Sequence, residues 1–207
     1  MNHGHSVLSG SLGLTLKLET QGRTAEARKA SLNGKVSIRV KNGVLKRYSL
    51  ISKIFSFLNV SQLLELKLPD LVAKGIPYKE IGGDFQIKNG IAQTDNLFLA
   101  SRSLNMAAIG QIDLTRKSLN LTIAVQPLQT VDKVVALVPI LGHILTDEKK
   151  SLILAFFNAK GPWNDPSVTP IPFASLRKGI LGIFKRIFLL PKDVVKEPWE
   201  VLLPKLP

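Results

Sequence analysis

The stretch from Ile81 to Val125 constrains the fold most, because it has the pattern of four consecutive antiparallel strands. Within each strand the apolar residues are separated by even steps, so their side chains point to one face of the sheet. The apolar sets of the successive strands are Ile81, Phe85 and Ile87; Ile91, Leu97 and Leu99; Leu104, Met106, Ile112 and Leu114; and Leu119, Leu121, Ile123 and Val125. The opposite face is polar and suits water, with Asp84, Gln86, Lys88, Asn105, Gln111, Asp113, Asn120, Thr122 and Gln126. Such a meander must cover its apolar face with helices, a second sheet or a ligand.

The turns decide whether the apolar faces of these strands agree. Asn89-Gly90 is a strong hairpin signal. A two-residue turn would pair Lys88 with Ile91 and place Ile87 and Ile91 on opposite faces. A three-residue loop, with Gly90 left-handed beside a bulge, would pair Ile87 with Ile91, and we therefore expect this loop. The next two turns, 100–103 and 115–118, are expected to pair Leu99 with Leu104 and Leu114 with Leu119.

The flanking segments add further strands and several helices. Alternation of apolar and polar residues predicts strands over Val7–Thr20, over Lys35–Lys41 up to a turn at Asn42-Gly43, and over Ser151–Gly161. The helical period predicts a short helix over Thr24–Ala30 capped by Thr24, one or two helices over Tyr48–Leu66, and a helix over Gln129–Ile144. The segment Gly161–Pro172 is expected to be a crossover punctuated by prolines.

The last regular segment, Phe173–Leu190, has the pattern of an amphipathic helix that Pro191 ends or kinks. Its apolar face consists of Phe173, Leu176, Ile180, Ile183, Phe184, Ile187 and Phe188. Gly179 and Gly182 are expected to permit close packing on the sheet. The opposite side is basic and, together with a tail that contains a tryptophan, suits an anionic membrane surface. The membrane-contact candidates are Lys178, Lys185, Arg186 and Trp199. An amphipathic helix is more often part of a core, but we expect this segment to dock on a membrane or to close one end of the predicted sheet.

Composition restricts the class of protein. The chain has 207 residues, 45% of them hydrophobic, which supports a real core. Its formal net charge of +13 favours anionic partners such as phospholipid head groups or nucleic acid. The absence of cysteine excludes disulfides and thiol catalysis. The best apolar run, Val134–Leu145, is too short to cross a membrane, and the first residues do not read as a signal peptide. We expect either a soluble protein or the C-terminal part of a longer, anchored chain.

No catalytic or metal-binding pattern is present in the sequence. It contains none of the hydrolase, phosphate-loop, zinc-protease or dinucleotide motifs. The histidines are His3, His5 and His143. His3 and His5 could touch a metal, but we expect them to belong to a loose terminus, and we expect His143 to be a packed or surface residue. We therefore expect no enzyme activity, no cofactor and no metal. Nucleic-acid binding is also not expected, because only 6% of the residues are aromatic and the polar face lacks a stacking platform.

Several short motifs resemble one known family. They are Leu32-Asn33-Gly34, Asn42-Gly43, Ser61-Gln62-Leu63-Leu64, 85–90 (FQIKNG), 110–114 (GQIDL), 138–142 (VPILG) and 161–166 (GPWNDP). Their order and spacing, over Leu8 to Pro191, resemble the C-terminal region of AsmA-like proteins, the bacterial relatives of bridge-like lipid-transfer proteins. The chain departs from full-length members because it lacks their N-terminal membrane helix and most of their repeats, so a bridge spanning the periplasm by itself is not expected.

The resemblance implies a fold and a function. The expected fold is mainly β (α+β): an elongated, curved antiparallel sheet or gutter with a few amphipathic helices, divided into a gutter domain at 1–172 and a C-terminal helix and tail at 173–207. The implied location is the Gram-negative envelope, on the periplasmic side of the inner membrane. The implied function is to bind or conduct phospholipid, or another anionic lipid, in support of outer-membrane biogenesis. The lipid-groove candidates are Phe85, Ile87, Leu97, Leu99, Leu104, Met106, Ile112, Leu114, Leu119, Leu121, Ile123 and Val125.

Two alternatives belong to other classes of protein. If helices cover the apolar face completely, the chain is a structural adaptor for outer-membrane assembly that binds an envelope protein. The other alternative is an enzyme whose site has no recognisable motif. Lipid that co-purifies with the protein would distinguish the groove from the covered core.

Overall fold

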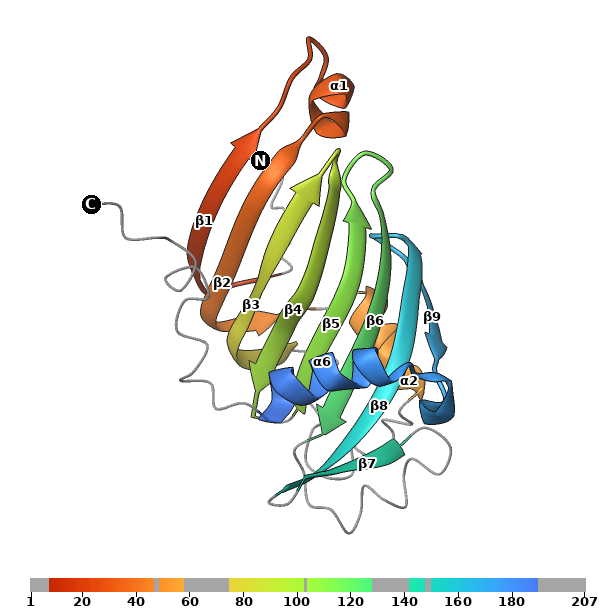
Figure 1. The fold of residues 1–207 in the computed structure, drawn as a ribbon. Coiled ribbons are helices and arrows are strands. Elements are labelled where there is room, and N and C mark those ends of the chain that lie inside the picture. The colour runs from red at the N-terminus through yellow and green to blue at the C-terminus, as the bar shows by residue number, and fades with distance from the viewer. Residues whose placement is uncertain are drawn as a thin grey trace, which may run out of the picture.

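The computed structural model describes residues 8–46, 49–57, 75–102, 104–127, 142–147 and 150–189. Its main feature is an open nine-stranded sheet in the order β1-β2-β3-β4-β5-β6-β8-β7, with β9 also paired to β8 (Figure 1). The strands are β1 (Ser11–Glu19), β2 (Asn33–Leu45), β3 (Ile76–Lys88), β4 (Ile91–Ser101), β5 (Leu104–Asp113), β6 (Ser118–Pro127), β7 (Gly142–Asp147), β8 (Lys150–Pro162) and β9 (Ser167–Pro170). The helices are α1 (Ala25–Ala30), α2 (Ser49–Phe57), the 3-10 turn η1 (Phe173–Ser175) and α6 (Lys178–Leu189). Every pairing is antiparallel, which confirms the predicted mainly β fold with few helices and a C-terminal helix.

The first segments fold as the sequence predicts. The alternating leucines form β1, and the polar residues of β1 point to the other face. Thr24 caps α1, because its side-chain oxygen accepts a hydrogen bond from the Ala27 N–H at 3.1 Å. The predicted turn at Asn42-Gly43 is wrong, since β2 continues through both residues to Leu45. Asn42 has a left-handed φ of 55°, and a Cβ on Gly43 would lie 1.8 Å from the Ser9 carbonyl oxygen. The pair therefore forms an irregularity where the chain before β1 passes close to β2.

The hairpin at Asn89-Gly90 corrects a second prediction. The turn has two residues, with φ of 49° and 75°, and it pairs Lys88 with Ile91. Ile91 therefore lies on the opposite face from Ile87 and is 40% exposed. A β-bulge in β4, between Thr94 and Leu97, adds one residue and returns the following side chains to the apolar face. The expected bulge exists, but it lies inside the strand instead of beside the turn.

The strand register at each of the two later turns differs from the prediction by two residues. A shift of two leaves every side chain on its predicted face. Leu99 pairs with Met106, not with Leu104, and Ile112 pairs with Leu119. Leu114 therefore falls beyond β5, where its N–H donates a hydrogen bond to the Gly90 carbonyl oxygen at 2.9 Å. At the first turn, longer strands satisfy more backbone groups before the chain turns. At the second, Asp113 Oδ1 accepts hydrogen bonds from the Thr115 and Arg116 N–H groups at 2.9 and 2.8 Å, so the chain turns directly after Asp113.

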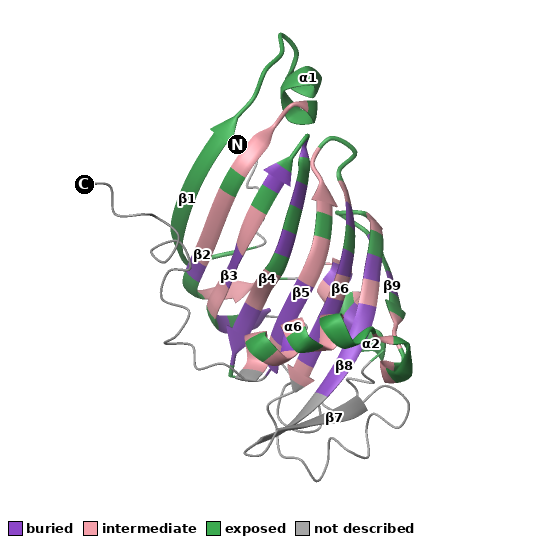
Figure 2. Cartoon of the chain, in the orientation of Figure 1, coloured by how far each residue is buried: buried purple, intermediate pink, exposed green. Residues whose placement is uncertain are grey.

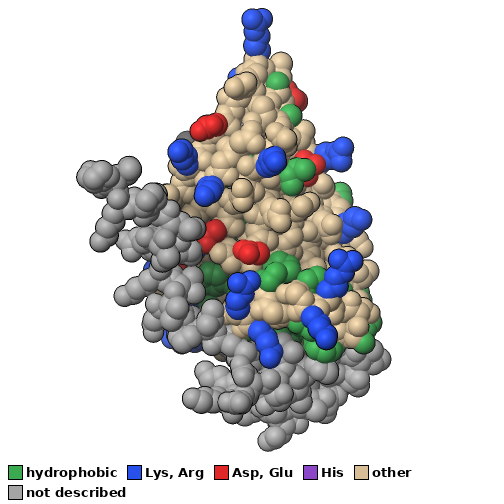
Figure 3. Space-filling view, viewed as in Figure 1, with side chains coloured by type: hydrophobic (Ala, Val, Ile, Leu, Met, Phe, Trp, Pro, Cys, Tyr) green, Lys and Arg blue, Asp and Glu red, His purple; other side chains and the backbone are tan. Residues whose placement is uncertain are grey.

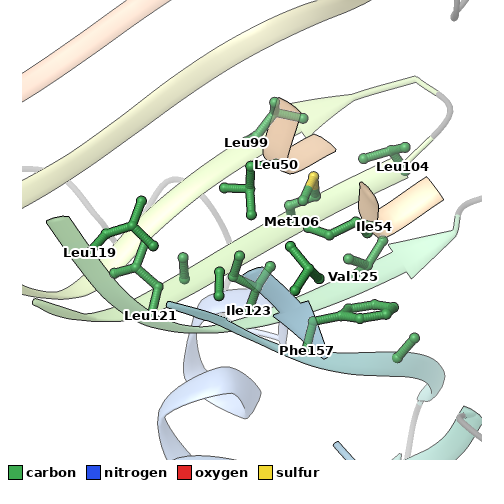
Figure 4. Close-up of a cluster of buried hydrophobic side chains, with 14 of the residues drawn as sticks. Leu50, Ile54, Leu99, Leu104, Met106, Leu119, Leu121, Ile123, Val125 and Phe157 are labelled. Carbon is green, nitrogen blue, oxygen red and sulfur yellow. The ribbon is translucent and has the colours of Figure 1, made fainter. Parts of the chain in front are cut away.

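The sheet carries a hydrophobic core on each face. On the face that holds Leu99, Met106 and Val125, here called the apolar face, Leu50 and Ile54 of α2 complete the larger core (Figure 4). On the opposite face, here called the polar face, α6 crosses the sheet in front of β4, β5, β6 and β8 (Figure 1). The buried residues of this second core, between the sheet and α6, are Ala107, Ala124, Leu154, Phe156 and Phe184. The expectation that water covers this whole face is therefore wrong near α6.

The aromatic side chains fix α6 on the sheet. The ring of Phe184, which is fully buried, lies 5.6 Å from that of Phe156 between centroids. Phe173 of η1 packs on the same Phe156 ring at 6.2 Å. Gly179 and Gly182 do not make the close contact expected of them, because nothing lies within 4 Å of a Cβ placed on either residue.

Of the remaining predictions, some are confirmed, some are wrong and some concern residues that the structure does not describe. The segment 142–144 forms part of β7 instead of the end of the predicted helix, and the rest of that helix lies outside the described residues. Residues 58–66 and the tail with Trp199 also lie outside them. The proline-punctuated crossover contains β9, a strand that the sequence pattern did not reveal. Strand β8 and the C-terminal helix are confirmed.

Candidate functional site: an open apolar sheet face

Cross-strand register makes the apolar face continuous across the sheet. One row of directly paired residues runs through Leu12, Val40, Ile81, Leu99, Met106, Val125 and Ala155. A further row on the same face begins with Leu16, Val36 and Phe85. Side chains opposite one another on paired strands are close enough to pack, so these rows form one apolar surface from β1 to β8.

The exposure of this surface changes along the sheet. Leu12, Leu14 and Leu16 of β1 are 62%, 51% and 54% exposed, whereas Ile123 and Val125 of β6 are 2% and 1% exposed. Figure 2 shows β1 as exposed throughout and the buried residues gathered on the central and later strands. Among the described residues, α2 covers the later strands and no helix covers β1. The covered core and the open groove therefore coexist on one face.

The predicted groove residues lie together, but most of them are in the covered part. Ile87, Leu99, Leu104, Met106, Leu119, Leu121, Ile123 and Val125 are at most 7% exposed. Phe85, Leu97 and Ile112 are half-buried on the same face, and Leu114 is half-buried in the turn after β5. The structure thus brings the set into one surface and shows that only its edge toward β1 is accessible.

The exposed leucines of β1 belong to the accessible part of the apolar face, but the sequence analysis did not include them among the lipid-groove candidates. The sequence predicts a strand over Val7–Thr20 from alternation alone, and nothing in that pattern shows whether a second layer covers Leu12, Leu14 and Leu16. The usable signal was the position of the strand, because a strand at the edge of a sheet has neighbours on one side only. A row of leucines there leaves an unusually large apolar surface for a monomeric protein.

The polar face carries a hydrogen-bonded cluster around Asp84. Ser37 Oγ donates to Asp84 Oδ1 at 2.7 Å, and Asn96 Nδ2 and Arg39 Nη2 donate to Oδ2 at 2.6 and 3.2 Å. Burial of the carboxyl raises the Asp84 pKa, but the three hydrogen bonds and the Arg39 charge outweigh it and hold the pKa below its usual value. Asn96 lies in the bulge of β4 and also accepts the Asp84 N–H at 2.8 Å. The cluster is a structural clasp between β2, β3 and β4, because both oxygens of the carboxylate accept hydrogen bonds from the neighbouring strands.

The membrane-contact candidates lie on α6. Lys178 and Arg186 are exposed, Lys185 is half-buried, and Trp199 lies outside the described residues. The first turn of α6 contains no acidic residue, and the helix as a whole contains none. Among the described helices, none is long and apolar enough to cross a membrane. No cluster of metal-ligating side chains occurs among the described residues either.

A comparison with protein families decides the identity of this architecture. The family model described as YhdP protein matches residues 1–168. The chain belongs to the YhdP protein family. Neither the curated proteins nor the solved structures searched contain a match to the chain.

Membership of the YhdP family agrees with the main features of the fold. YhdP proteins are AsmA-like members of the bridge-like lipid-transfer group and are associated with the bacterial envelope. The family is not known as enzymatic. The match to YhdP proteins ends before η1 and α6, so it covers the sheet as far as the beginning of β9 and leaves the C-terminal helix unmatched.

Proposed function

We propose that this YhdP-family chain binds phospholipid in the bacterial envelope by holding acyl chains on the open part of its apolar face. The observation that carries the proposal is the exposed row Leu12, Leu14 and Leu16 of β1, which continues without interruption into the apolar face. Val36 and Phe85, both half-buried, extend this surface over β2 and β3.

The energetics of apolar contact are sufficient for such binding. Each CH₂ group removed from water contributes about 0.8 kcal/mol, so a single long acyl chain gains several kcal/mol even when it is only partly covered. Because acyl chains differ little from one another, the same surface should discriminate weakly between lipid species. Leu12, Leu14 and Leu16 carry no charge that would fix a lipid at one position, which suits movement of lipid along the sheet.

The test compares two substitutions on adjacent residues of one exposed strand. Leu14→Asp places a charge on the apolar face, and Thr15→Asp places the same charge on the polar face as its control. Native mass spectrometry of each purified protein, with extraction of lipid from the same sample, measures the lipid retained. We expect wild type and Thr15→Asp to retain phospholipid and Leu14→Asp to retain about a tenth as much or less.

Either contrary result rejects the groove. If wild-type protein carries no lipid and takes up none from liposomes, the open leucines bind a protein, as in the structural adaptor. If Leu14→Asp retains as much lipid as Thr15→Asp, the lipid does not lie on this face.

The C-terminal segment has a separate role in this proposal. Residues 1–172 hold lipid, and residues 173–207 contact an anionic membrane surface, with the chain acting as the C-terminal part of an AsmA-like gutter on the periplasmic side of the inner membrane. The support for the membrane contact is the basic surface of α6, which exposes Lys178 and Arg186 with no acidic residue on the helix.

Charge reversal tests the membrane contact independently of the groove. Lys178→Glu, Lys185→Glu and Arg186→Glu together should reduce sedimentation with phosphatidylglycerol vesicles at least about tenfold, because each basic residue near an anionic bilayer contributes about 1 kcal/mol. A triple variant on α1, on β2 and just after β2, Lys29→Glu, Lys41→Glu and Lys46→Glu, changes the net charge equally and should bind nearly as wild type. Equal loss in both variants would show a general effect of net charge instead of a docking helix.

A further inference from the structure

The polar face carries a row of amide and lysine side chains that crosses the sheet from edge to edge. The row has one residue per strand, each directly opposite the next: Lys17, Lys35, Gln86, Gln93, Gln111, Asn120, Lys160 and Ser167. Adjacent strands lie about 4.8 Å apart, so the row offers hydrogen-bonding groups at about that spacing over roughly 30 Å. Figure 3 shows this face, with few hydrophobic side chains above α6 and with lysines, arginines and several acidic side chains distributed over it.

These side chains are accessible and are not used by the fold. All eight residues of the row are exposed. Among the described residues, the amides of Gln86, Gln93, Gln111 and Asn120 take part in none of the side-chain hydrogen bonds, in contrast to Asn105, which donates to Gln126 at 3.1 Å. An amide ladder that stabilised the sheet would be hydrogen-bonded from one strand to the next. These amides are therefore available to water or to a ligand.

The charges at the two ends of the row indicate the sign of the ligand. Lys17 and Lys35 are directly opposite each other on β1 and β2, an arrangement that repels and costs stability unless an anion lies between them. They line a hollow of about 510 Å³ together with Gln86 and Gln93. Lys160 supplies a cation near the other end. Two acidic residues, Asp84 and Asp95, also line the hollow. Asp84 is already paired with Arg39, so the two lysines of the hollow exceed its remaining acidic residue, the exposed Asp95, by one charge.

We propose that this row binds a linear, β-linked polysaccharide that carries carboxylate groups, lying across the strands on the polar face. Amides are both donors and acceptors and therefore match the hydroxyl and N-acetyl groups of sugar rings. The rings of an extended β-linked chain repeat at nearly the spacing of the strands, so successive rings can meet successive amides. The lysines then pair with the carboxylates of the polymer. The site lies on the opposite face from the lipid groove and does not depend on it.

The absence of an aromatic residue from the row predicts how the affinity depends on length. Each ring gains only hydrogen bonds that replace bonds to water, and each such bond contributes little by itself. Binding must therefore add up over several rings, and short sugars should bind poorly. This dependence separates a site built across the sheet from a single sugar pocket.

The experiment is titration calorimetry of the full chain with oligosaccharides of hyaluronate, which alternate N-acetylglucosamine with a carboxylated sugar. We expect the octasaccharide to bind at least about tenfold more tightly than the disaccharide. The variant Gln86→Ala, Gln93→Ala and Gln111→Ala should weaken octasaccharide binding about tenfold or more, with the protein still folded by circular dichroism. Lys17→Ala with Lys160→Ala should also weaken it, whereas Lys29→Ala with Lys41→Ala, which removes the same charge away from the row, should not.

Three outcomes would overturn the proposal. The first is the absence of saturable binding of the octasaccharide by folded wild-type protein. The second is equal affinity in the amide variant and wild type, which would place any binding elsewhere. The third is strong binding of phosphatidylglycerol vesicles that depends on the same lysines while the octasaccharide does not bind, which would make this face a membrane surface. Lipid retention by the amide variant should stay at the wild-type level, so this test and that of the lipid groove fail or succeed separately.

Discussion

At the scale of single residues, one inserted residue decides how the central strands pair. The bulge of β4 holds Asn96, whose amide donates to Asp84 Oδ2 at 2.6 Å and whose oxygen accepts the Asp84 N–H at 2.8 Å. Arg39, 3.2 Å from the same carboxylate, also lies over the ring of Phe98, 6.0 Å from its centroid. The side chain of Asp84 is 28% exposed, so its hydrogen bonds are shielded in part from water. Sequence patterns cannot show this clasp, because its members come from three strands.

Substitution of Asp84 should therefore cost stability in a pH-dependent way. Asp84→Ala should lower the free energy of unfolding by about 2 kcal/mol at pH 7, because hydrogen bonds to a charged group are lost and their donors remain partly buried. The folded state holds the Asp84 pKa below its ordinary value of 3.8. The stabilisation is thus complete above pH 3.8 and is lost as the pH falls through the lower, folded-state pKa.

Urea unfolding of wild type and variant at pH 7 and at pH 2.5 measures this difference. Asp95→Ala removes an exposed carboxylate from the same strand as Asn96 and should change the stability little at either pH. A loss in Asp84→Ala no larger than that in Asp95→Ala would contradict the clasp.

At the scale of elements, we expect apolar burial, and not the ion pair of Lys53, to hold α2 on the sheet. Ile54 is fully buried among the side chains of the apolar face. Lys53 Nζ lies 2.8 Å from Asp165 Oδ1 and also donates to the Pro166 carbonyl oxygen at 2.8 Å. Hydrogen bonds from Lys53 and Ser49 lower the Asp165 pKa, but water surrounds the pair and screens its energy.

The two contacts of α2 should differ clearly in their effect on stability. Ile54→Ala should lower the free energy of unfolding by about 3 kcal/mol, since it removes a buried side chain and leaves a cavity. Lys53→Ala should have a much smaller effect, because solvent already competes for the pair. Thermal unfolding followed by circular dichroism compares them. A larger loss in Lys53→Ala than in Ile54→Ala would show that the loop contact, and not the core, fixes α2.

At the scale of the whole molecule, the sheet is closed on neither side, and its β1 edge is both exposed and apolar. All nine residues of β1 are exposed, and no described strand pairs with its outer edge. A long exposed edge with a row of leucines is a template for pairing with another chain. Proteins usually protect such edges with charge, and β1 has Lys17 and Glu19 only near its end.

Purified protein free of lipid should therefore associate as its concentration rises. We expect Leu14→Asp to keep the protein monomeric at concentrations where wild type and Thr15→Asp form larger species, because an inward-pointing charge on an edge opposes pairing. Size-exclusion chromatography with light scattering measures the mass directly. A wild-type protein that stays monomeric at all concentrations would show that this edge does not pair with a second copy.

The sequence by itself determined the elements whose patterns are local. Four features were predicted from the sequence alone: the alternation in β1, the Thr24 cap of α1, the apolar sets of the central strands and the amphipathic period of α6. Each depends on the geometry of one segment, where side chains alternate in a strand and recur every three or four residues in a helix. The apolar face itself was therefore predictable, and so were nearly all the residues on it.

Only the tertiary structure decided the register and the covering of that face. The two-residue turn at Asn89-Gly90 is compatible with the apolar face only because the bulge near Asn96 corrects the register, and that bulge is stabilised by contacts between distant strands. The positions of α2 and α6 on opposite faces likewise depend on packing between segments far apart in the chain. Burial is a property of the whole chain, since a leucine in β1 and one in β6 have the same local pattern and differ only in what lies over them.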